Sequence, residues 1–264
     1  MNKIVFYGCG NISQSIIQGL ISSGVSVKDI SFIDRNPINK NKLKEMGINA
    51  HNKKNPVHSE ALVILAVKPK DANNALKEIS DITLSPKLIS VVAGIKIENL
   101  NKYFNEAQIV RAMPITASAF KKGITAVYGE DNNKELVKET KKIFDQVGKS
   151  IILKNEDEMN VFTGLIGSGS AYFFYLLEVY EQHLLRLCNN NKKDVNDIMV
   201  NFLDGISSSI NNGTSLNEAI KLIASEGGTT EAGINSLKGN NVLQLFEKGI
   251  ISAVNRSKEL GDEY

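Results

Sequence analysis

The sequence predicts an α/β protein, with a doubly wound sheet in its N-terminal part and helices alone in its C-terminal part. Two patterns lead to this prediction. Up to about residue 155, short apolar runs alternate with stretches of helical spacing, an order typical of a sheet with helices on both faces. From about Glu156 onward, apolar residues recur only at helical spacing. We therefore expect a sheet domain at residues 1–155 and a helical domain at residues 156–264.

The predicted strands are short and mostly apolar. Leu62 to Val67 is unbroken apolar sequence, as expected of a parallel strand covered on both faces. Helical spacing occurs after the first strand, before Gly47, between the third and fourth strands, and at residues 134–147. The expected strands are residues 3–7, 30–33, 62–67, 88–93, 108–113, 124–128 and 150–153.

In the C-terminal part, helical spacing runs through residues 162–187, 195–210, 216–223 and 242–254. Residues 171–180, A-Y-F-F-Y-L-L-E-V-Y, are so apolar that they need cover on more than one side. A subunit interface would provide it. The alternative is that this helix forms the centre of a monomeric bundle.

Composition and charge exclude several classes of protein. The 264 residues carry 31 basic and 29 acidic side chains, a net charge of +2, far from the concentrated positive field that nucleic-acid binding requires. Cys9 and Cys188 have neither metal-type nor redox-type spacing. Residues 1–7 lack the parts of a signal peptide, and no apolar run reaches membrane-spanning length. We expect a cytoplasmic protein without a membrane, nucleic-acid or metal partner.

A glycine motif follows the first predicted strand. In G-C-G-N-I-S, residues 8–13, Gly8 permits a tight turn, and Gly10 lets the backbone approach a pyrophosphate at a helix N-terminus. Ser13 stands where Gly or Ala is usual, and its hydroxyl needs a partner. The motif predicts a Rossmann-type dinucleotide site, the alternative being an ordinary strand-to-helix turn. The expected contacts are Gly8, Cys9, Gly10, Asn11 and Ile12.

Two further strand ends are expected at this site. Asp34 could accept hydrogen bonds from an adenosine ribose, which favours NADH, whereas Arg35 could hold the additional phosphate of NADPH, so the pair leaves the choice open. The next strand ends in A-V-K-P, at the edge where ligands of such folds bind, although a lysine there could also simply reach solvent. Its expected contacts are Ala66, Val67, Lys68 and Pro69.

A second glycine motif, S-E-G-G-T-T at residues 225–230, interrupts the helical region. Adjacent glycines in a helix cost roughly 1 kcal/mol each, so some gain should offset them. At a helix start they expose backbone N–H groups suited to a carboxylate, and the threonines add hydroxyls. The alternative is a helix N-cap without a ligand.

Taken together, five motifs resemble the pyrroline-5-carboxylate reductase family over nearly the whole chain: G-C-G-N-I, A-V-K-P, R-A-M-P at 111–114, G-S-G-S-A-Y at 167–172 and S-E-G-G-T-T. The resemblance implies reduction of a cyclic imine to proline with NADPH or NADH. It also implies a Rossmann domain and a helical domain that forms an intertwined dimer, with further assembly into larger rings, possible pentamers of dimers. It places the substrate against Ser225, Gly227, Gly228, Thr229 and Thr230, with Thr230 as the catalytic residue facing the ring nitrogen.

Three residues depart from the family pattern, in which Asn is common at 115, Pro at 170 and Pro at 226; this chain has Ile115, Ser170 and Glu226. They leave room for a catalytically silent, regulatory nucleotide-binding homologue. A related imine reductase or β-hydroxyacid-type dehydrogenase is a third reading. Such dehydrogenases usually rely on a lysine in the helical domain, and here Lys192 and Lys193 lie in a polar turn.

Overall fold

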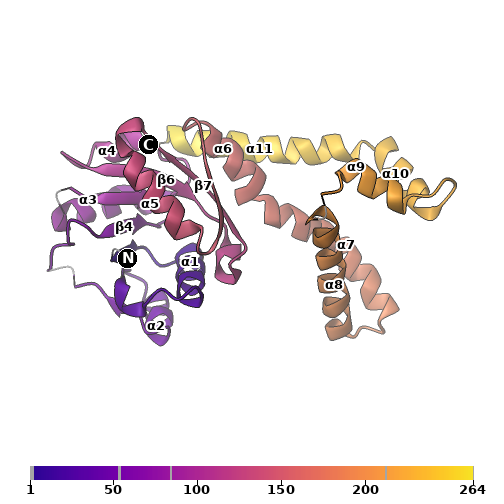
Figure 1. Ribbon diagram of the computed structural model, residues 1–264, viewed down its shortest axis with the longest axis horizontal. Coiled ribbons are helices and arrows are strands. Elements are labelled where there is room, and N and C mark those ends of the chain that lie inside the picture. The colour runs from indigo at the N-terminus through magenta and orange to yellow at the C-terminus, as the bar shows by residue number, and fades with distance from the viewer. Residues whose placement is uncertain (1–2, 53–54, 84, 212, 264) are drawn as a thin grey trace. The chain divides into compact units, whose positions relative to one another are not determined.

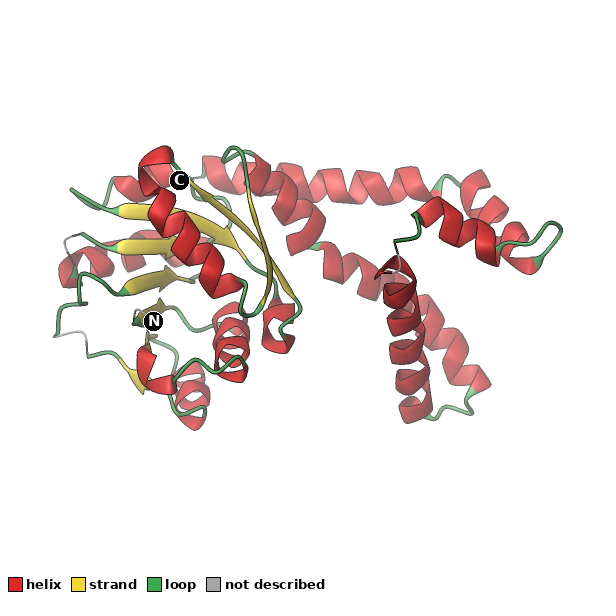
Figure 2. Cartoon of the chain, in the orientation of Figure 1, coloured by secondary structure: helices red, strands yellow, loops and turns green. Residues whose placement is uncertain are grey.

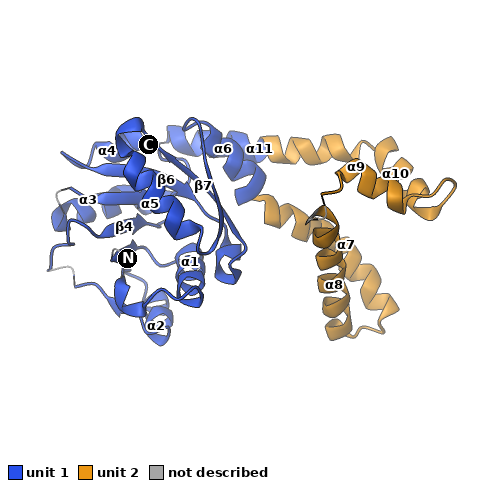
Figure 3. Cartoon of the chain, in the orientation of Figure 1, with its two compact units in different colours: residues 1–167, 252–264 blue, residues 168–251 orange. Residues whose placement is uncertain are grey.

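The computed structural model describes residues 3–52, 55–83, 85–211 and 213–263. The chain forms two compact units (Figure 3), one of residues 1–167 with 252–264 and the other of residues 168–251. The end of the last helix therefore belongs to the first unit. The predicted domain boundary at residue 155 precedes this division and stays a prediction.

In the described part of the first unit, eight strands form one sheet in the order β3-β2-β1-β4-β5-β6-β7-β8 (Figure 1). This confirms the predicted Rossmann-type sheet, because β2, β1, β4, β5 and β6 all run parallel to one another. The strands are β1 (Ile4–Tyr7), β2 (Ile30–Ile33), β3 (Asn49–Ala50), β4 (Leu62–Leu65), β5 (Lys87–Ser90), β6 (Gln108–Met113), β7 (Gly123–Gly129) and β8 (Gly148–Ile152).

Helices cover both faces of the sheet, since alternate strand residues enter two separate cores. Ile4 and Phe6 of β1 pack with α1, α2 and α5, whereas Val5 and Tyr7 pack with α3 and α4. A doubly covered parallel strand must be apolar throughout, which explains the unbroken run of β4. These helices are α1 (Asn11–Ser22), α2 (Pro37–Glu45), α3 (Ala72–Ile82), α4 (Ile97–Asn101) and α5 (Lys134–Phe144).

The sheet differs from the sequence prediction in several details, among them the bounds of β5 and β8, which were expected at 88–93 and 150–153. The short β3 was not predicted, because its two residues are exposed and carry no apolar pattern. Strand β4 ends at Leu65, and Pro69 begins a 3₁₀ turn (Pro69–Asp71) instead of ending the strand. Strand β7 pairs antiparallel with β6, because residues 114–122 are too few for a crossover.

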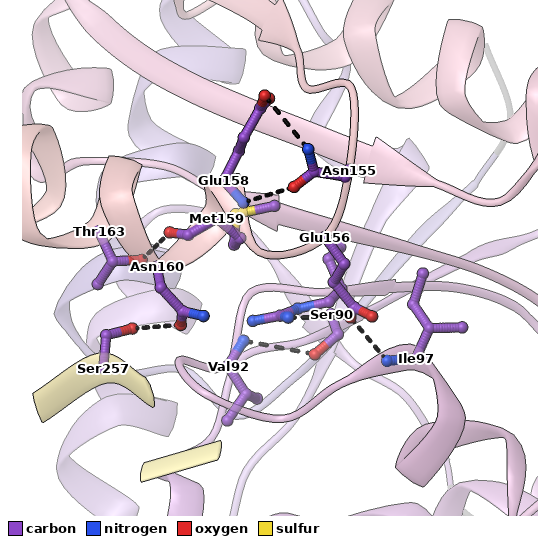
Figure 4. A network of polar contacts seen from close by, with 11 residues as sticks. Ser90, Val92, Ile97, Asn155, Glu156, Glu158, Met159, Asn160, Thr163 and Ser257 are labelled. Carbon is purple, nitrogen blue, oxygen red and sulfur yellow. Dashed lines mark hydrogen bonds and ion pairs between the residues drawn. The ribbon is translucent and has the colours of Figure 1, made fainter. Parts of the chain in front are cut away.

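Polar contacts join β6 to the segment that leads into α6 (Glu158–Phe162) (Figure 4). The Arg111 side chain is 3% exposed, and its Nη1 lies 2.9 Å from Glu156 Oε1. The same oxygen accepts the Ile97 N–H at the start of α4, at 2.8 Å. Nearby, Ser257 Oγ donates to Asn160 Oδ1 at 2.9 Å, which links the end of α11 (Val242–Asp262) to α6. Burial lowers the pKa of Arg111, and the carboxylate of Glu156 opposes this shift.

The second unit contains only helices in its described residues (Figure 2), which confirms the predicted helical region. Helix α7 exposes large apolar side chains in the isolated chain: Phe173, Phe174 and Tyr175 are 61%, 68% and 73% exposed. Among the described residues, no helix combines the length and apolarity needed to cross a membrane. The helices are α7 (Gly169–Leu187), α8 (Lys192–Asn211), α9 (Leu216–Ile223), α10 (Thr229–Gly239) and α11 (Val242–Asp262), which ends in the first unit.

Replacing Glu156 by alanine should destabilise the first unit by about 3 kcal/mol, because the buried guanidinium of Arg111 would lose its carboxylate partner. Urea denaturation would measure the change. Asp157→Ala is the matched control: this neighbouring carboxylate is exposed and makes no capping hydrogen bond to α6, so the expected change is below about 0.5 kcal/mol. Equal losses of stability for the two substitutions would contradict the role of Glu156 as the stabilising partner of the buried Arg111.

Candidate functional site

A cavity of about 400 Å³ opens at the carboxyl ends of β1, β2 and β4. It lies where the strand order reverses, between β1 and β4, the place where ligands of open α/β sheets bind. Its volume is in the range of small-molecule and cofactor sites. The lining residues are Tyr7, Gly8, Cys9, Gly10, Ile33, Asp34, Arg35, Asn36, Asn39, Ala66, Val67, Lys68, Lys70, Asp71 and Ala75.

The two glycines of the first motif have different physical roles. Gly8 has φ +89°, and a Cβ there would lie 2.7 Å from the Ala66 carbonyl oxygen, so the fold itself requires glycine. A Cβ at Gly10 would meet no atom of the chain within 4 Å. The Ser13 hydroxyl finds its partner in the Gly8 carbonyl oxygen, at 2.6 Å. The turn is therefore closed on its inner side and open on the side of the cavity.

The start of α1 offers the features that a pyrophosphate needs. Gly10 is the N-cap of this 12-residue helix, and no side chain caps the first turn. The N–H groups there, together with the helix dipole, favour an anion, and the open space at Gly10 lets one approach. The residues present thus fit a dinucleotide.

Asp34 ties the first turn to the end of β2. Its Oδ2 accepts the Cys9 N–H at 2.6 Å and the side-chain amide of Asn39 at 3.2 Å, and its Oδ1 accepts the Asn36 N–H at 2.6 Å. Burial, followed by the charge of Asp34, raises the pKa of the Cys9 thiol, which keeps it neutral. This cysteine therefore contributes its backbone to the site.

Next to Asp34, the guanidinium of Arg35 forms an ion pair with Glu78 of α3. The other carboxylate oxygen of Glu78 accepts the hydroxyl of Tyr7, the last residue of β1. Burial raises the pKa of Tyr7, and the charge of Arg35 opposes this. Tyr7 and Arg35 line the cavity, whereas Glu78 does not. Glu78 therefore fixes the positions of two lining side chains from outside the lining.

Most of the predicted cofactor contacts meet in this cavity. Asn11 and Ile12 lie in the first turn of α1, and Pro69 lies in the turn before α3, outside the lining. The lining residues that the sequence prediction missed are Tyr7, Ile33, Asn36, Asn39, Lys70, Asp71 and Ala75. The D-R-N-P order offered a signal for Asn36, because Asn before Pro is typical of a helix N-cap, and its side chain does accept the Ile38 N–H at 2.9 Å.

In the second unit, the glycine–threonine segment Ser225 to Thr230 starts α10, as expected of the motif. Gly227 has φ +69°, and Gly228 is the N-cap without a side-chain hydrogen bond. Two of the N–H groups expected to grip a carboxylate have partners within the chain: Gly227 donates to Glu231 Oε2 at 2.7 Å, and Gly228 donates to the Ser225 carbonyl at 3.0 Å. A substrate carboxylate would have to compete with the carboxylate of Glu231.

The three departures from the family pattern lie in different settings. Ile115 is half-buried at the N-cap of the 3₁₀ turn Thr116–Phe120, where its carbonyl oxygen accepts from Ser118. Ser170 is exposed in the first turn of α7, and Glu226 is exposed beside the glycines. Within the described residues, no group of three or more His, Cys, Asp or Glu side chains is arranged to hold a metal ion.

Substitution at the two glycines should separate folding from nucleotide binding. Gly10→Ala should change the free energy of unfolding by no more than about 1 kcal/mol, because its Cβ enters open space and the backbone is extended. It should weaken NADH or NADPH binding by about tenfold or more, because the methyl group occupies the path of the pyrophosphate. Gly8→Ala should destabilise the fold itself. Calorimetric titration and thermal melts would test the pair; unchanged binding by Gly10→Ala would contradict the assignment.

Two family models match the sequence. Residues 3–94 match the model described as "NADP oxidoreductase coenzyme F420-dependent", and residues 156–260 match "Pyrroline-5-carboxylate reductase dimerisation". Among solved structures, a pyrroline-5-carboxylate reductase from Coxiella burnetii superposes with a TM-score of 0.84 at 29% identity over 98% of each chain. A Plasmodium falciparum pyrroline carboxylate reductase with NADP bound gives 0.85 at 21% identity over 98% of each chain, a likeness of fold.

Curated relatives agree over nearly the full length. The pyrroline-5-carboxylate reductase of Pasteurella multocida is 28% identical over 269 residues, which cover 98% of this chain and 97% of the relative. That of Staphylococcus epidermidis is 30% identical over 268 residues, with the same coverage. Together with the glycine-lined cavity and the helical second unit, these matches confirm the resemblance found in the motifs. The chain belongs to the pyrroline-5-carboxylate reductase family.

Proposed function

We propose that this protein reduces 1-pyrroline-5-carboxylate to L-proline with NADPH or NADH, the last step of proline biosynthesis. The observation that carries the proposal is the glycine-lined cavity at the sheet's switch point, in a chain of this family. The nicotinamide cofactor supplies the hydride when it is bound. The chain's own residues bind and orient the two reactants.

On the cofactor side, the first turn of α1 would hold the pyrophosphate through backbone N–H groups, and Asp34 would accept hydrogen bonds from the adenosine ribose. Ala66, Val67 and Lys68 form the opposite wall after β4. Their backbone would line the nicotinamide end of the bound cofactor. Orientation of this kind can supply much of the rate when the reaction needs little proton transfer.

On the substrate side, Ser225 to Thr230 hold the cyclic imino acid, and Gly227, Gly228 and Thr229 face its carboxylate. A protonated imine is already electrophilic, so a hydride supplied by the bound cofactor would add to its carbon, the C=N π electrons would pass to nitrogen, and the nitrogen would keep its proton. The hydroxyl of Thr230 lies at the ring nitrogen, where it accepts the N–H and fixes the orientation of the ring. Binding of the carboxylate displaces Glu231 from the Gly227 N–H.

The proposal includes self-association in the cytoplasm. Residues 156–260 match a dimerisation model, and α7 exposes an apolar surface that a second copy of the chain would cover. We propose an intertwined dimer that assembles further, as a pentamer of dimers. A cytoplasmic location is supported by the free thiols of Cys9 and Cys188.

A catalytically silent homologue is the second candidate, and one observation favours it: Glu231 occupies the Gly227 N–H while Glu226 adds a further carboxylate to the segment. The two functions are distinguished by mixing purified protein with pyrroline-5-carboxylate and NADPH or NADH, and following the absorbance of the reduced nicotinamide. Turnover with proline as product is expected. Cofactor binding without turnover would identify the silent homologue, and turnover with a hydroxyacid alone would identify a dehydrogenase.

Thr230→Ala should lower kcat by about tenfold, because the ring nitrogen loses the hydroxyl that orients it, while the Kd of the cofactor stays nearly unchanged. Thr230→Ser keeps the hydroxyl and should retain most of the activity. Ser236→Ala, an exposed position on the same helix, serves as the control for nonspecific damage to α10. Full activity of Thr230→Ala would remove this residue from the mechanism.

A further inference from the structure

Glu78 is an acidic side chain behind the cavity that sequence patterns do not point to. It lies on α3, 43 residues after Arg35 and 71 after Tyr7, and its two carboxylate oxygens accept from the Arg35 guanidinium and the Tyr7 hydroxyl. Its side chain is 28% exposed, whereas that of Arg35 is 67% exposed. The Tyr7 hydroxyl therefore holds one oxygen of Glu78, and the other oxygen pairs with the more exposed Arg35.

This ion pair bears on the end of the cavity where the adenosine ribose is expected. Arg35 is the cation next to Asp34, and its charge is balanced by Glu78. The other two cations that line the cavity, Lys68 and Lys70, follow β4 and share that segment with Asp71. Because β1 lies between β4 and β2 in the sheet, these lysines come from a different strand end than Asp34. The guanidinium next to Asp34 in the sequence, that of Arg35, is therefore already paired with one carboxylate, that of Glu78.

We propose that Glu78 is a specificity-determining residue that makes this protein prefer NADH to NADPH. The inference rests on the proposed function, since it assumes a nicotinamide dinucleotide in the cavity. Asp34 accepts three N–H groups and, as a carboxylate with about four acceptor sites, retains room for a ribose hydroxyl. A 2′-phosphate in that place would meet the negative charge of Asp34.

Arg35 would be the group to offset this repulsion, because a guanidinium binds phosphate in a bidentate manner. In this structure, it already has a carboxylate partner, and the phosphate would have to displace Glu78 or share the guanidinium with it. Displacement would cost the partly buried carboxylate of Glu78 its ion pair with the guanidinium, while the Tyr7 hydroxyl continues to donate to it. Glu78 thereby resolves the choice that the adjacent Asp34 and Arg35 leave open in the sequence.

The test is a calorimetric titration of the full-length protein with NADH and with NADPH, repeated with 5′-AMP and adenosine 2′,5′-bisphosphate, which isolate the contribution of the 2′-phosphate. The wild type should bind NADH about tenfold or more tightly than NADPH. Glu78→Gln keeps the shape of the side chain but removes its charge, and it should reduce this ratio by about tenfold, mainly through tighter NADPH binding. The bisphosphate should gain affinity in parallel, and 5′-AMP should not.

Two further variants assign the effect. Arg35→Ala in the Glu78→Gln background should abolish the gain in NADPH affinity, because the guanidinium freed by Glu78→Gln is the source of that gain. Asp81→Asn removes an exposed charge from the same helix and should leave the ratio unchanged. Thermal melts check folding, and Glu78→Ala replaces Glu78→Gln should the latter not fold.

The outcomes distinguish this inference from the proposed function. If neither NADH nor NADPH binds the folded wild type, the assignment of the cavity as a cofactor site is wrong. If both bind but the wild type takes NADPH as tightly as NADH, or Glu78→Gln leaves the ratio unchanged, the role of Glu78 is overturned and the cofactor site stands.

Discussion

The close approach of the first βα turn to the end of β4 is the constraint on which the cofactor site depends. A side chain at Gly8 would collide with the Ala66 carbonyl, so the chain can turn there only as glycine with positive φ. In the same turn, the Gly8 carbonyl oxygen accepts the Ser13 hydroxyl, and the Cys9 N–H donates to the carboxylate of Asp34. The N-terminus of α1 and the ends of β2 and β4 are thereby brought to one cavity.

Sequence patterns predict the parts of this arrangement that depend on neighbouring residues. The glycine motif, the apolar run of β4 and the glycine–threonine start of α10 are local, because each follows from backbone geometry and burial within a few residues. The reversal of β7 is less visible, since it depends on the length of residues 114–122 and not on the strand's own composition. The short β3 has no apolar signal at all.

Pairing over long sequence distances lies beyond such patterns. Nothing near Arg35 in the sequence indicates that its charge is balanced from α3, and nothing near Arg111 points to Glu156. In each case the two partners meet only when two distant elements pack together. A charged residue that the sequence predicts to be solvated therefore becomes part of a defined ion pair. Glu231 is intermediate: it lies four residues after Gly227, but its contact depends on the positive φ of that glycine.

Asp34 couples the two recognition tasks of the cavity. Its carboxylate accepts the Cys9 N–H in the turn that we propose binds the pyrophosphate, and we propose that the same carboxylate meets the ribose. A change in charge at this carboxylate would therefore act on the turn as well as on the nucleotide, so selectivity cannot be retuned at Asp34 without loosening the turn. Arg35 pairs with Glu78, and Glu78 also accepts the Tyr7 hydroxyl, so we propose that selectivity is set by this pair. Asp34 and the Arg35–Glu78 pair are therefore under different constraints. Asp34 is constrained by folding because it closes the turn, and we propose that the Arg35–Glu78 pair is constrained mainly by the ligand.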